Sequence, residues 1–558
     1  MLRPATLVIT AALSFAGGPA PVSAQSSVPP SSVASDTVSR QPAVDDVDTT
    51  VESDVAPVDT EADVPSTSTP ETSVPGDVGN EVDRPDTEVD VRPSAPPQVQ
   101  RSDIPTGSIA LALVVLAVVA TFSTVLVRRR PGRGDQRQPA ARGAVPAPET
   151  ATLDFLLELG EALIDAGDAV SHVEATLRTV GSVNGIEDLG VLVLPTALIV
   201  SVPGSGNVST EVGAAGRDRL RLDQVDDVLR LVNEAERGRI GVVEGTERLE
   251  RIRASAPPFR APVVLTGYVL STVGLAAILH AGWRELVLAG ALGLVIGWFR
   301  LATQELTSSY QPFIPLIAAT AVSISVFAAA RVVADLVTFP VLVSPLIFFL
   351  PGALLTIAAL ELTTGQIVAG ASRLAAGGLQ LVLLALGIVA GAQLVGIPAG
   401  ELPTGGDGAF GVIAPWVGVA VFGVGVAWFN GARTSALAWI LVVLYVAYSG
   451  QVIGGLFFGS SLSAFFGAVA MTPVAVLAAR QPSGPTPLVM FLPGFWLLVP
   501  GALGLEGVSR ILGDGGVGAG ALVTTLTSMI GISLGILLGL ILAARDPERP
   551  WAETRGPE

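Results

Sequence analysis

From residue 262 onward the chain consists of apolar stretches, each close to the length of a membrane-spanning helix. A helix needs about 20 mostly apolar residues to cross the hydrocarbon core, and irregular backbone facing lipid leaves polar groups unsatisfied. The stretches therefore predict a polytopic α-helical membrane protein. We place the ten predicted spans at 262–280, 285–302, 313–333, 338–360, 374–396, 409–429, 434–450, 453–479, 487–505 and 517–544.

The ten predicted spans fall into two groups of five, one within residues 259–397 and one within 409–545, separated by the polar loop 398–408. Because five is odd, the second group must enter the membrane in the opposite sense from the first. The sequence therefore predicts a core of two inverted five-helix repeats, an architecture found in secondary transporters.

The fourth span of each group contains the same phrase, Phe-Leu-Pro-Gly, at 349–352 and again at 491–494. Proline and glycine interrupt helices, and interrupted backbone at membrane depth is tolerated where it is buried in protein or lines a cavity. We therefore expect two antiparallel broken helices at a substrate site; the alternative is that the prolines only kink packed helices. The predicted broken-helix residues are Pro351, Gly352, Pro493 and Gly494.

Two carboxylates follow the repeated phrase, Glu361 in the first group and Glu506 in the second. Ionisable groups in or beside spans are costly and are functional candidates. Burial disfavours the charged form of a carboxyl group, so either residue could carry a proton, with Arg373 as a partner. Placement at the interface, with the charge at a helix end, is the alternative. Three further residues could hydrogen-bond a polar substrate or hold helices together: Thr363, Gln393 and Asn430.

The N-terminal part of the chain is unlike the rest. Residues 1–24 have a basic start, an apolar run and a small-residue end, which is typical of a secretory signal peptide cleaved after Ala24; an uncleaved anchor is the alternative. Residues 25–103 contain seventeen Asp or Glu and four Arg with almost no aromatic residues. This composition predicts a disordered acidic tail, and its charge argues against a nucleic-acid partner.

Residues 104–130 predict one additional membrane helix, because the apolar run 108–127 is followed at once by three arginines. Positive residues remain on the cytoplasmic side. The acidic tail is therefore predicted outside, and the basic linker 131–149 and the C-terminal tail 546–558 are predicted in the cytoplasm.

Residues 150–258 predict a small cytoplasmic α+β domain. Leucines recur at helical spacing from Leu153 to Leu163, and helical spacing returns after Val225. Between these segments, 191–202 is predicted to be one buried strand with an irregularity at Pro195.

Absent and rare residue types exclude several functions. The chain has no cysteine and no lysine, which rules out disulfides, a thiolate metal site, a lysine P-loop and a Schiff base. Asp168 and His172 lie one helical turn apart near Ser171, but the serine faces away, so we interpret them as an exposed helix pair and not as a catalytic group. We predict no enzymatic activity, no cofactor and no metal.

Several of these segments resemble the threonine/serine exporter family of bacteria. The similar segments are FLLELGEAL at 155–163, VEATL at 173–177, LPTALIVSVPG at 194–204, the region 350–373 and the phrase at 492–494. The resemblance covers about residues 150–545. The acidic tail and the extra helix are additions, and Gln366 stands where an acid would be expected from the family pattern.

The resemblance implies a soluble domain followed by ten helices and proton-driven export of threonine and serine. We therefore expect an antiporter in a bacterial plasma membrane, with amino acids, protons and lipid as its partners. Glu361, Glu506 and Arg373 would take part in proton coupling. A membrane-anchored signalling or scaffold protein is the alternative.

Overall fold

The computed structural model describes residues 148–203, 208–216, 219–304, 310–333, 335–396, 411, 413–498, 505 and 519–543. These residues all belong to one compact unit. The predicted signal peptide, acidic tail, first membrane helix and basic linker lie outside the described residues, as do the loop 398–408, Glu506 and the C-terminal tail 546–558.

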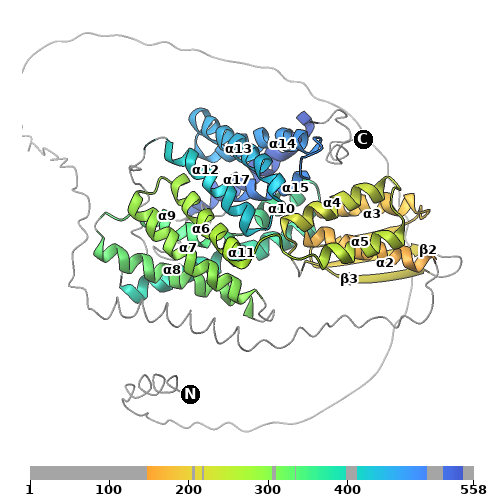
Figure 1. Ribbon diagram of the computed structural model, residues 1–558, viewed down its shortest axis with the longest axis horizontal. Helices are drawn as coiled ribbons and strands as arrows, with labels where there is room; N and C mark the ends of the chain where they lie inside the picture. Colours follow the sequence, from red (N-terminus) through yellow and green to blue (C-terminus); the bar gives the residue numbers. More distant parts are fainter. Residues whose placement is uncertain are drawn as a thin grey trace, which may run out of the picture. The chain divides into compact units, whose positions relative to one another are not determined.

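Residues 148–255, which we call the sheet domain, contain four helices and one sheet (Figure 1). The helices are α2 (Pro148–Asp165), α3 (Val170–Val183), α4 (Leu222–Glu236) and α5 (Val242–Arg253). Helix α2 packs against α3, α5 and strands of the sheet. Its leucines at the predicted helical spacing are almost completely buried, with Leu156, Leu159 and Leu163 all at 0% exposure.

The sheet of this domain has three antiparallel strands in the order β1–β2–β3. They are β1 (Gly190–Leu194), β2 (Ala197–Pro203) and β3 (Val208–Ala214). The single strand predicted at 191–202 is therefore wrong: Leu194 pairs with Ala197, so the chain turns back at Pro195. Proline lacks the N–H group that a continuing ladder needs, which explains why the apolar run folds into a hairpin.

The remaining elements are mostly long apolar helices, and seven of them are long and apolar enough to cross a membrane. A bent pair, α9 with η2 followed by α10, gives an eighth candidate span, and α12 and α15 are shorter apolar helices. The elements are α6 (Ala261–Ile278), α7 (Trp283–Thr303), α8 (Phe313–Val332), α9 (Thr338–Val343), η2 (Ser344–Phe349), α10 (Gly352–Thr363), α11 (Ile367–Val395), α12 (Ile413–Phe429), η3 (Thr434–Ala436), α13 (Leu437–Phe458), α14 (Ser460–Ala479), α15 (Pro487–Leu498) and α17 (Ala519–Ala543).

Each of the ten predicted spans overlaps at least one of these helices, although the boundaries differ. The clearest difference lies between α13 and α14. We expected the turn near residue 451, but α13 continues to Phe458 and the chain turns at Gly459, whose φ is +80°. Glycine adopts this left-handed backbone without steric cost, which fixes the turn there.

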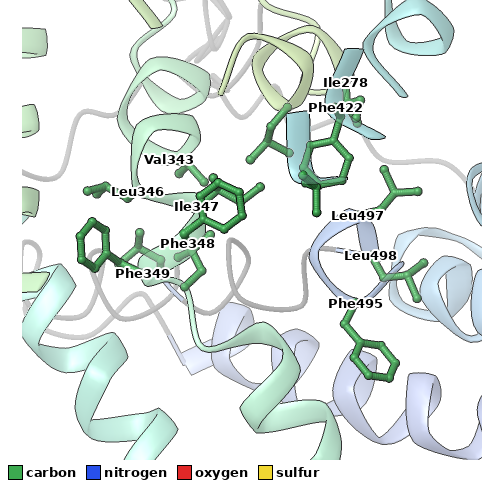
Figure 2. Packing of buried hydrophobic residues seen from close by; sticks show 14 of the residues in the cluster. Ile278, Val343, Leu346, Ile347, Phe348, Phe349, Phe422, Phe495, Leu497 and Leu498 are labelled. Carbon is green, nitrogen blue, oxygen red and sulfur yellow. The ribbon is translucent and has the colours of Figure 1, made fainter. Parts of the chain in front are cut away.

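The predicted break at the first phrase is present. The chain changes from the 3₁₀ helix η2 to α10 at Leu350–Pro351, with a bend of 66°. All six residues of η2 are buried. Figure 2 shows their apolar side chains in one cluster with Phe422 of α12 and Phe495 of α15. The interrupted backbone is therefore enclosed by protein, as membrane-depth irregular structure requires.

The second phrase does not break its helix. Helix α15 continues through Pro493 and Gly494, so the predicted interruption there is wrong. One proline removes a single backbone donor, whereas the first segment has prolines at three places, 340, 345 and 351. The two phrases are nevertheless neighbours, because a Cβ built at Gly352 would lie 3.5 Å from the carbonyl oxygen of Phe495.

Close glycine contacts define how the two groups of helices pack. In α6 and α12, the first helix of each group, Gly267 lies against the backbone around Phe429 and Gly274 against the backbone around Phe422. Because the residue numbers run in opposite directions, the two helices are antiparallel. Small residues allow this close backbone approach in membrane proteins.

The third and fifth helices of each group also pack alike. In the first group, Gly387 and Gly391 of α11 lie against residues 316–320 and 320–323 of α8. In the second, Gly535 and Gly539 of α17 lie against residues 465–469 and 469–472 of α14. In both groups the residue numbers of the two helices rise together, so α8 is parallel to α11 and α14 is parallel to α17. The same helix packing therefore occurs twice.

Candidate functional site

A cavity of about 340 Å³ lies where the sheet domain meets the membrane helices. Its volume falls in the range of small-molecule sites, about 300–1,000 Å³. The rim is largely polar and comes mainly from the sheet domain, whereas the floor is apolar and comes from α10, α15 and α17. The floor residues are Ile357, Leu360, Phe491, Phe495 and Ile536.

The floor lies beside the place where the two Phe-Leu-Pro-Gly phrases meet. Phe495 lines the cavity, and its carbonyl oxygen would lie 3.5 Å from a Cβ built at Gly352. The cavity therefore lies between the sheet domain and the helices that flank the break between η2 and α10, although Pro351 and Gly352 do not line it. A mostly apolar space with a few charged groups at one end suits a small molecule with an apolar side chain and a charged head.

Asp168 and His172 belong to the rim of this cavity. His172 Nδ1 lies 2.7 Å from Asp168 Oδ2, and the other oxygen, Oδ1, accepts the N–H of Ala169 at 2.8 Å. The prediction of an exposed helix pair was wrong in two respects: Asp168 precedes α3, and the two side chains, His172 and Asp168, are only 20% and 13% exposed.

Beside the cavity, Glu361 and Arg373 form the ion pair that we expected. Glu361 Oε2 lies 3.2 Å from Arg373 Nε, with side-chain exposures of 0% and 8%. The angles do not make this contact a hydrogen bond, so the attraction is purely between the charges. Glu361 ends the bent pair, and Arg373 lies in the second turn of α11.

The sheet domain contacts both members of this ion pair. The N–H of Val170, the first residue of α3, donates to Glu361 Oε1 at 3.2 Å, and Arg373 Nη2 donates to the carbonyl oxygen of Asp168 at 3.2 Å. The start of a helix has unpaired N–H groups and a positive dipole end, both of which favour a carboxylate. Glu361 is thus held by a cation from one side and by a helix start from the other.

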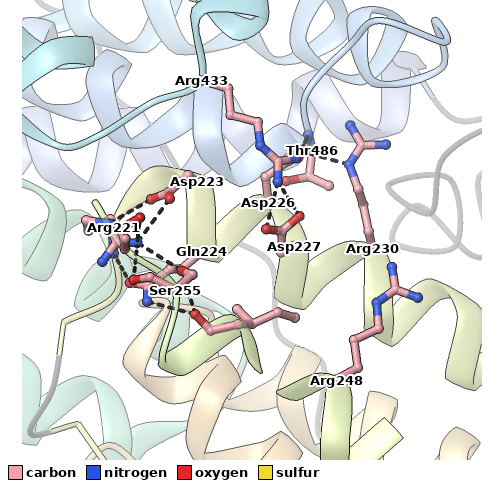
Figure 3. Close-up of polar contacts among 12 residues, drawn as sticks. Arg221, Asp223, Gln224, Asp226, Asp227, Arg230, Arg248, Ser255, Arg433 and Thr486 are labelled. Carbon is pink, nitrogen blue, oxygen red and sulfur yellow. Dashed lines mark hydrogen bonds and ion pairs between the residues drawn. The ribbon is translucent and has the colours of Figure 1, made fainter. Parts of the chain in front are cut away.

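A second polar network, shown in Figure 3, joins α4 to the second group of helices. Arg433, after α12, contacts both Asp227 oxygens at 2.7 Å and Asp226 at 3.5 Å. Asp226 also accepts the N–H of Thr486 at 2.8 Å, and Arg230 donates to the carbonyl oxygen of Gly484 at 2.8 Å. Two connections of the second group, the one that contains Arg433 and the one at Gly484–Thr486, therefore make polar contacts with α4.

These contacts show which ends of the helices face the sheet domain. The end of α10 meets it through Glu361, and the start of α15 meets it through Thr486. Helix α10 therefore runs toward the sheet domain and α15 runs away from it. The helices of the fourth span in each group, α10 and α15, are therefore antiparallel, as the sequence predicted.

Other predicted site residues lie elsewhere. Thr363 is exposed and donates to its own helix at Leu360, and Gln393 is exposed near the far end of α11. Asn430 bonds within α12, while its carbonyl oxygen accepts the N–H of Leu222 in the sheet domain. None of the three lines the cavity. Glu506 lies outside the described residues.

Two residues at the break were missed by sequence reasoning. Tyr268 Oη donates to the carbonyl oxygen of Pro345 at 2.7 Å, and Gln380 Nε2 donates to that of Phe349 at 2.5 Å. Both bonds tie carbonyl groups of the irregular segment to side chains of neighbouring helices. The sequence signal for Gln380 was available, since it is one of two amide side chains in the apolar run of α11.

The long apolar helices and the enclosed break define the class of protein: a multi-pass helical membrane protein. Residues 154–395 match the family model described as "Putative threonine/serine exporter". That region of the chain is therefore similar to this family.

Two curated relatives carry the name pheromone-regulated membrane protein 10. The one from Candida albicans is 23% identical over 415 residues, covering 70% of this chain and 37% of the relative. The one from Candida glabrata is 25% identical over 418 residues, covering 69% of this chain and 52% of the relative. The chain thus spans between about a third and a half of the length of these relatives. No solved structure matches it significantly.

Proposed function

We propose that the protein is a secondary active exporter of small neutral hydroxy amino acids, threonine and serine, that exchanges them for protons across the plasma membrane. The cavity carries this proposal, because it lies between the sheet domain and α10, the helix that follows the enclosed break. The similarity of residues 154–395 to the threonine/serine exporter family also supports a role in export. In this proposal the sheet domain and the C-terminus face the cytoplasm and the acidic N-terminal tail faces outward.

The repeated packing supports alternating access as the mechanism. The first helices of the two groups are antiparallel, and in each group the third and fifth helices pack in parallel through two glycines one turn apart. Exchange of the two groups' conformations would open the central site to either side in turn. Pro351 and Gly352 then form the hinge between η2 and α10. Pro493 and Gly494 lie in the neighbouring helix α15, which is continuous.

Glu361 is our proposed proton-linked carboxylate, with Arg373 as its partner and Glu506 as its counterpart in the second group. Glu361 is completely buried and borders the cavity through Leu360. When Glu361 binds a proton, its attraction to Arg373 is lost. A substrate-dependent movement of α10 would then be coupled to proton binding.

The test is flux of labelled threonine in proteoliposomes with and without a pH gradient. The unaltered protein should show threonine flux that the gradient accelerates. Glu361→Gln should lose the acceleration, whereas Glu285→Gln, which removes another buried carboxylate that accepts the N–H of Val337, should retain it. Threonine flux no greater than in empty vesicles would refute the transport assignment, and acceleration retained by Glu361→Gln would refute the role of that residue.

A further inference from the structure

We propose that the sheet domain is a lid over the cavity, held closed by two polar latches, one on each group of membrane helices. This inference rests on the proposed function only in treating the cavity as the route of the substrate. The first latch consists of Glu361 and Arg373 with the segment Asp168–Val170. The second latch consists of Asp226, Asp227 and Arg230 with Arg433 and the segment Gly484–Thr486.

The rim of the cavity belongs mainly to the lid. The segment between α2 and α3 supplies Asp168 and His172, and α4 supplies a row of residues that starts at Leu229 and ends at Glu236. The floor residues all come from the membrane helices. If the sheet domain moved away, the cavity would lose one wall and its floor would open to solvent on that side.

The two latches border this cavity on different sides. Asp168 belongs to both the first latch and the rim, and Arg230, Gly484 and Thr486 belong to both the second latch and the rim. A molecule entering from the side of the sheet domain must therefore pass between the latches. Opening either one widens the entrance directly.

The first latch is the more buried one. Its two charged side chains are 0% and 8% exposed. Both of its hydrogen bonds to the sheet domain involve backbone groups of the lid, the N–H of Val170 and the carbonyl oxygen of Asp168. Salt screens such buried charges only weakly, so this latch holds the lid at all ordinary ionic strengths.

The second latch is partly open to solvent and is therefore the one that opens first. The Arg433 side chain is 46% exposed and the Asp227 side chain is 29% exposed. Exposed ion pairs contribute little and are screened by salt. Asp226, with 6% side-chain exposure, provides the fixed point of this latch because it also binds the N–H of Thr486.

Together the latches connect the lid to both groups of helices at once. The first latch holds α10 and α11, and the second holds the two connections that precede α13 and α15. Rearrangement of one group relative to the other must strain or open at least one latch. The lid thus controls access to the cavity and also the relative position of the groups.

The test measures access to the cavity directly and needs no substrate. The chain has no cysteine, so Ile536→Cys places a single thiol on the cavity floor. The rate at which a membrane-impermeant maleimide, applied from the side of the sheet domain, modifies this floor thiol reports the open fraction of the lid. Glu244→Cys, at an exposed position of α5, is the control: its modification rate gives the reactivity of the maleimide toward a fully accessible thiol.

Arg433→Gln removes the two ion pairs that join α4 to the membrane helices and leaves the Arg230–Asp226 pair within α4 in place. It should raise the modification rate of the floor thiol by about fivefold, the equivalent of roughly 1 kcal/mol. Asp227→Asn removes only the exposed pair, leaves Asp226 in place and should raise the rate about twofold. Arg178→Gln, which breaks an exposed pair with Glu174 within α3, should leave the rate unchanged. Added salt should raise the modification rate of the floor thiol when the lid is unaltered, but not in Arg433→Gln.

Equal modification rates in all these variants, with normal folding of each, would overturn the lid. The outcome is independent of transport. A change in the modification rate without any threonine flux would support the lid and refute the exporter. Threonine flux with equal modification rates in all variants would support the exporter and refute the lid. If Arg433→Gln failed to fold, the milder Asp227→Asn and the salt series would still decide the question.

Discussion

The ion pair of Glu361 and Arg373 allows a quantitative prediction about stability. At 3.2 Å and an effective dielectric constant of about 20, the attraction between the two charges is about 5 kcal/mol. Desolvation of two charges with 0% and 8% exposure opposes it. Removing one partner leaves the other buried and unpaired, which is the more costly situation.

We therefore expect Arg373→Met to lower the free energy of unfolding by about 3–5 kcal/mol. Glu361→Gln should cost less, because its amide oxygen can still accept the N–H of Val170. The double variant should be less destabilised than the sum of the single variants. We expect a coupling energy of about 2–3 kcal/mol, near the upper end for directly interacting residues.

The assay is a double-mutant cycle from reversible unfolding in mixed micelles, monitored by circular dichroism. The matched control is the same cycle on Arg178 and Glu174, whose contact is short but exposed, at 55% and 23%. That cycle should give a coupling energy of about 0.5 kcal/mol or less. A coupling energy for Glu361 and Arg373 no larger than this control would refute the reasoning.

Two further predictions concern other parts of the chain. Gly425→Ala should lower stability by about 1–3 kcal/mol, because its Cβ would collide with the backbone of Ser271 in α6; Gly378→Ala, with no atom within 4 Å of its Cβ, should be neutral in the same thermal unfolding assay. Burial, and then the nearby Asp154, raise the pKa of Glu211 in β3, so the folded state favours the protonated form and loses stability as pH rises through that range. Glu211→Gln should therefore raise the melting temperature slightly at pH 7, with a gain in unfolding free energy below about 1 kcal/mol for this partly exposed group. The gain should shrink as the pH falls and the carboxyl group takes up its proton; a gain independent of pH would contradict this cause.

The polytopic helical class was predictable because each membrane helix depends on a local run of apolar residues. Among the described residues seven helices, or eight with the bent pair, are long and apolar enough to cross a membrane, so the count of ten spans stays a prediction. The break at Pro351 was also predictable, since three prolines interrupt one segment of about twenty residues. The same phrase misled us at Pro493, where a single proline is accommodated within α15. The difference depends on how neighbouring helices enclose the freed carbonyl groups, as Tyr268 and Gln380 do at the first break.

The candidate site was predictable only in part. Glu361 and Arg373 lie close together in the sequence, on either side of one short turn, so their pairing followed from the sequence. The contacts of Arg433 with Asp227 and of Thr486 with Asp226 join residues 206 and 260 positions apart. No local pattern indicates such partners, because each charged side chain alone is equally consistent with a solvated surface. The cavity itself arises from these distant contacts and was not foreseen.

The sheet domain gives the two groups different surroundings despite their similar packing. In the proposed inverted repeat, exchanging the conformations of the two groups leaves their internal packing energy nearly unchanged, so contacts outside the repeats decide which arrangement is populated. The sheet domain supplies such contacts on one side only. It binds the first group through a buried ion pair and the second through a partly exposed one. Because the second is weaker and screened by salt, it sets the free energy needed to leave the described arrangement. Substitutions at Arg433, which contacts the sheet domain, should therefore alter that balance more readily than substitutions of residues that pack only within their own group.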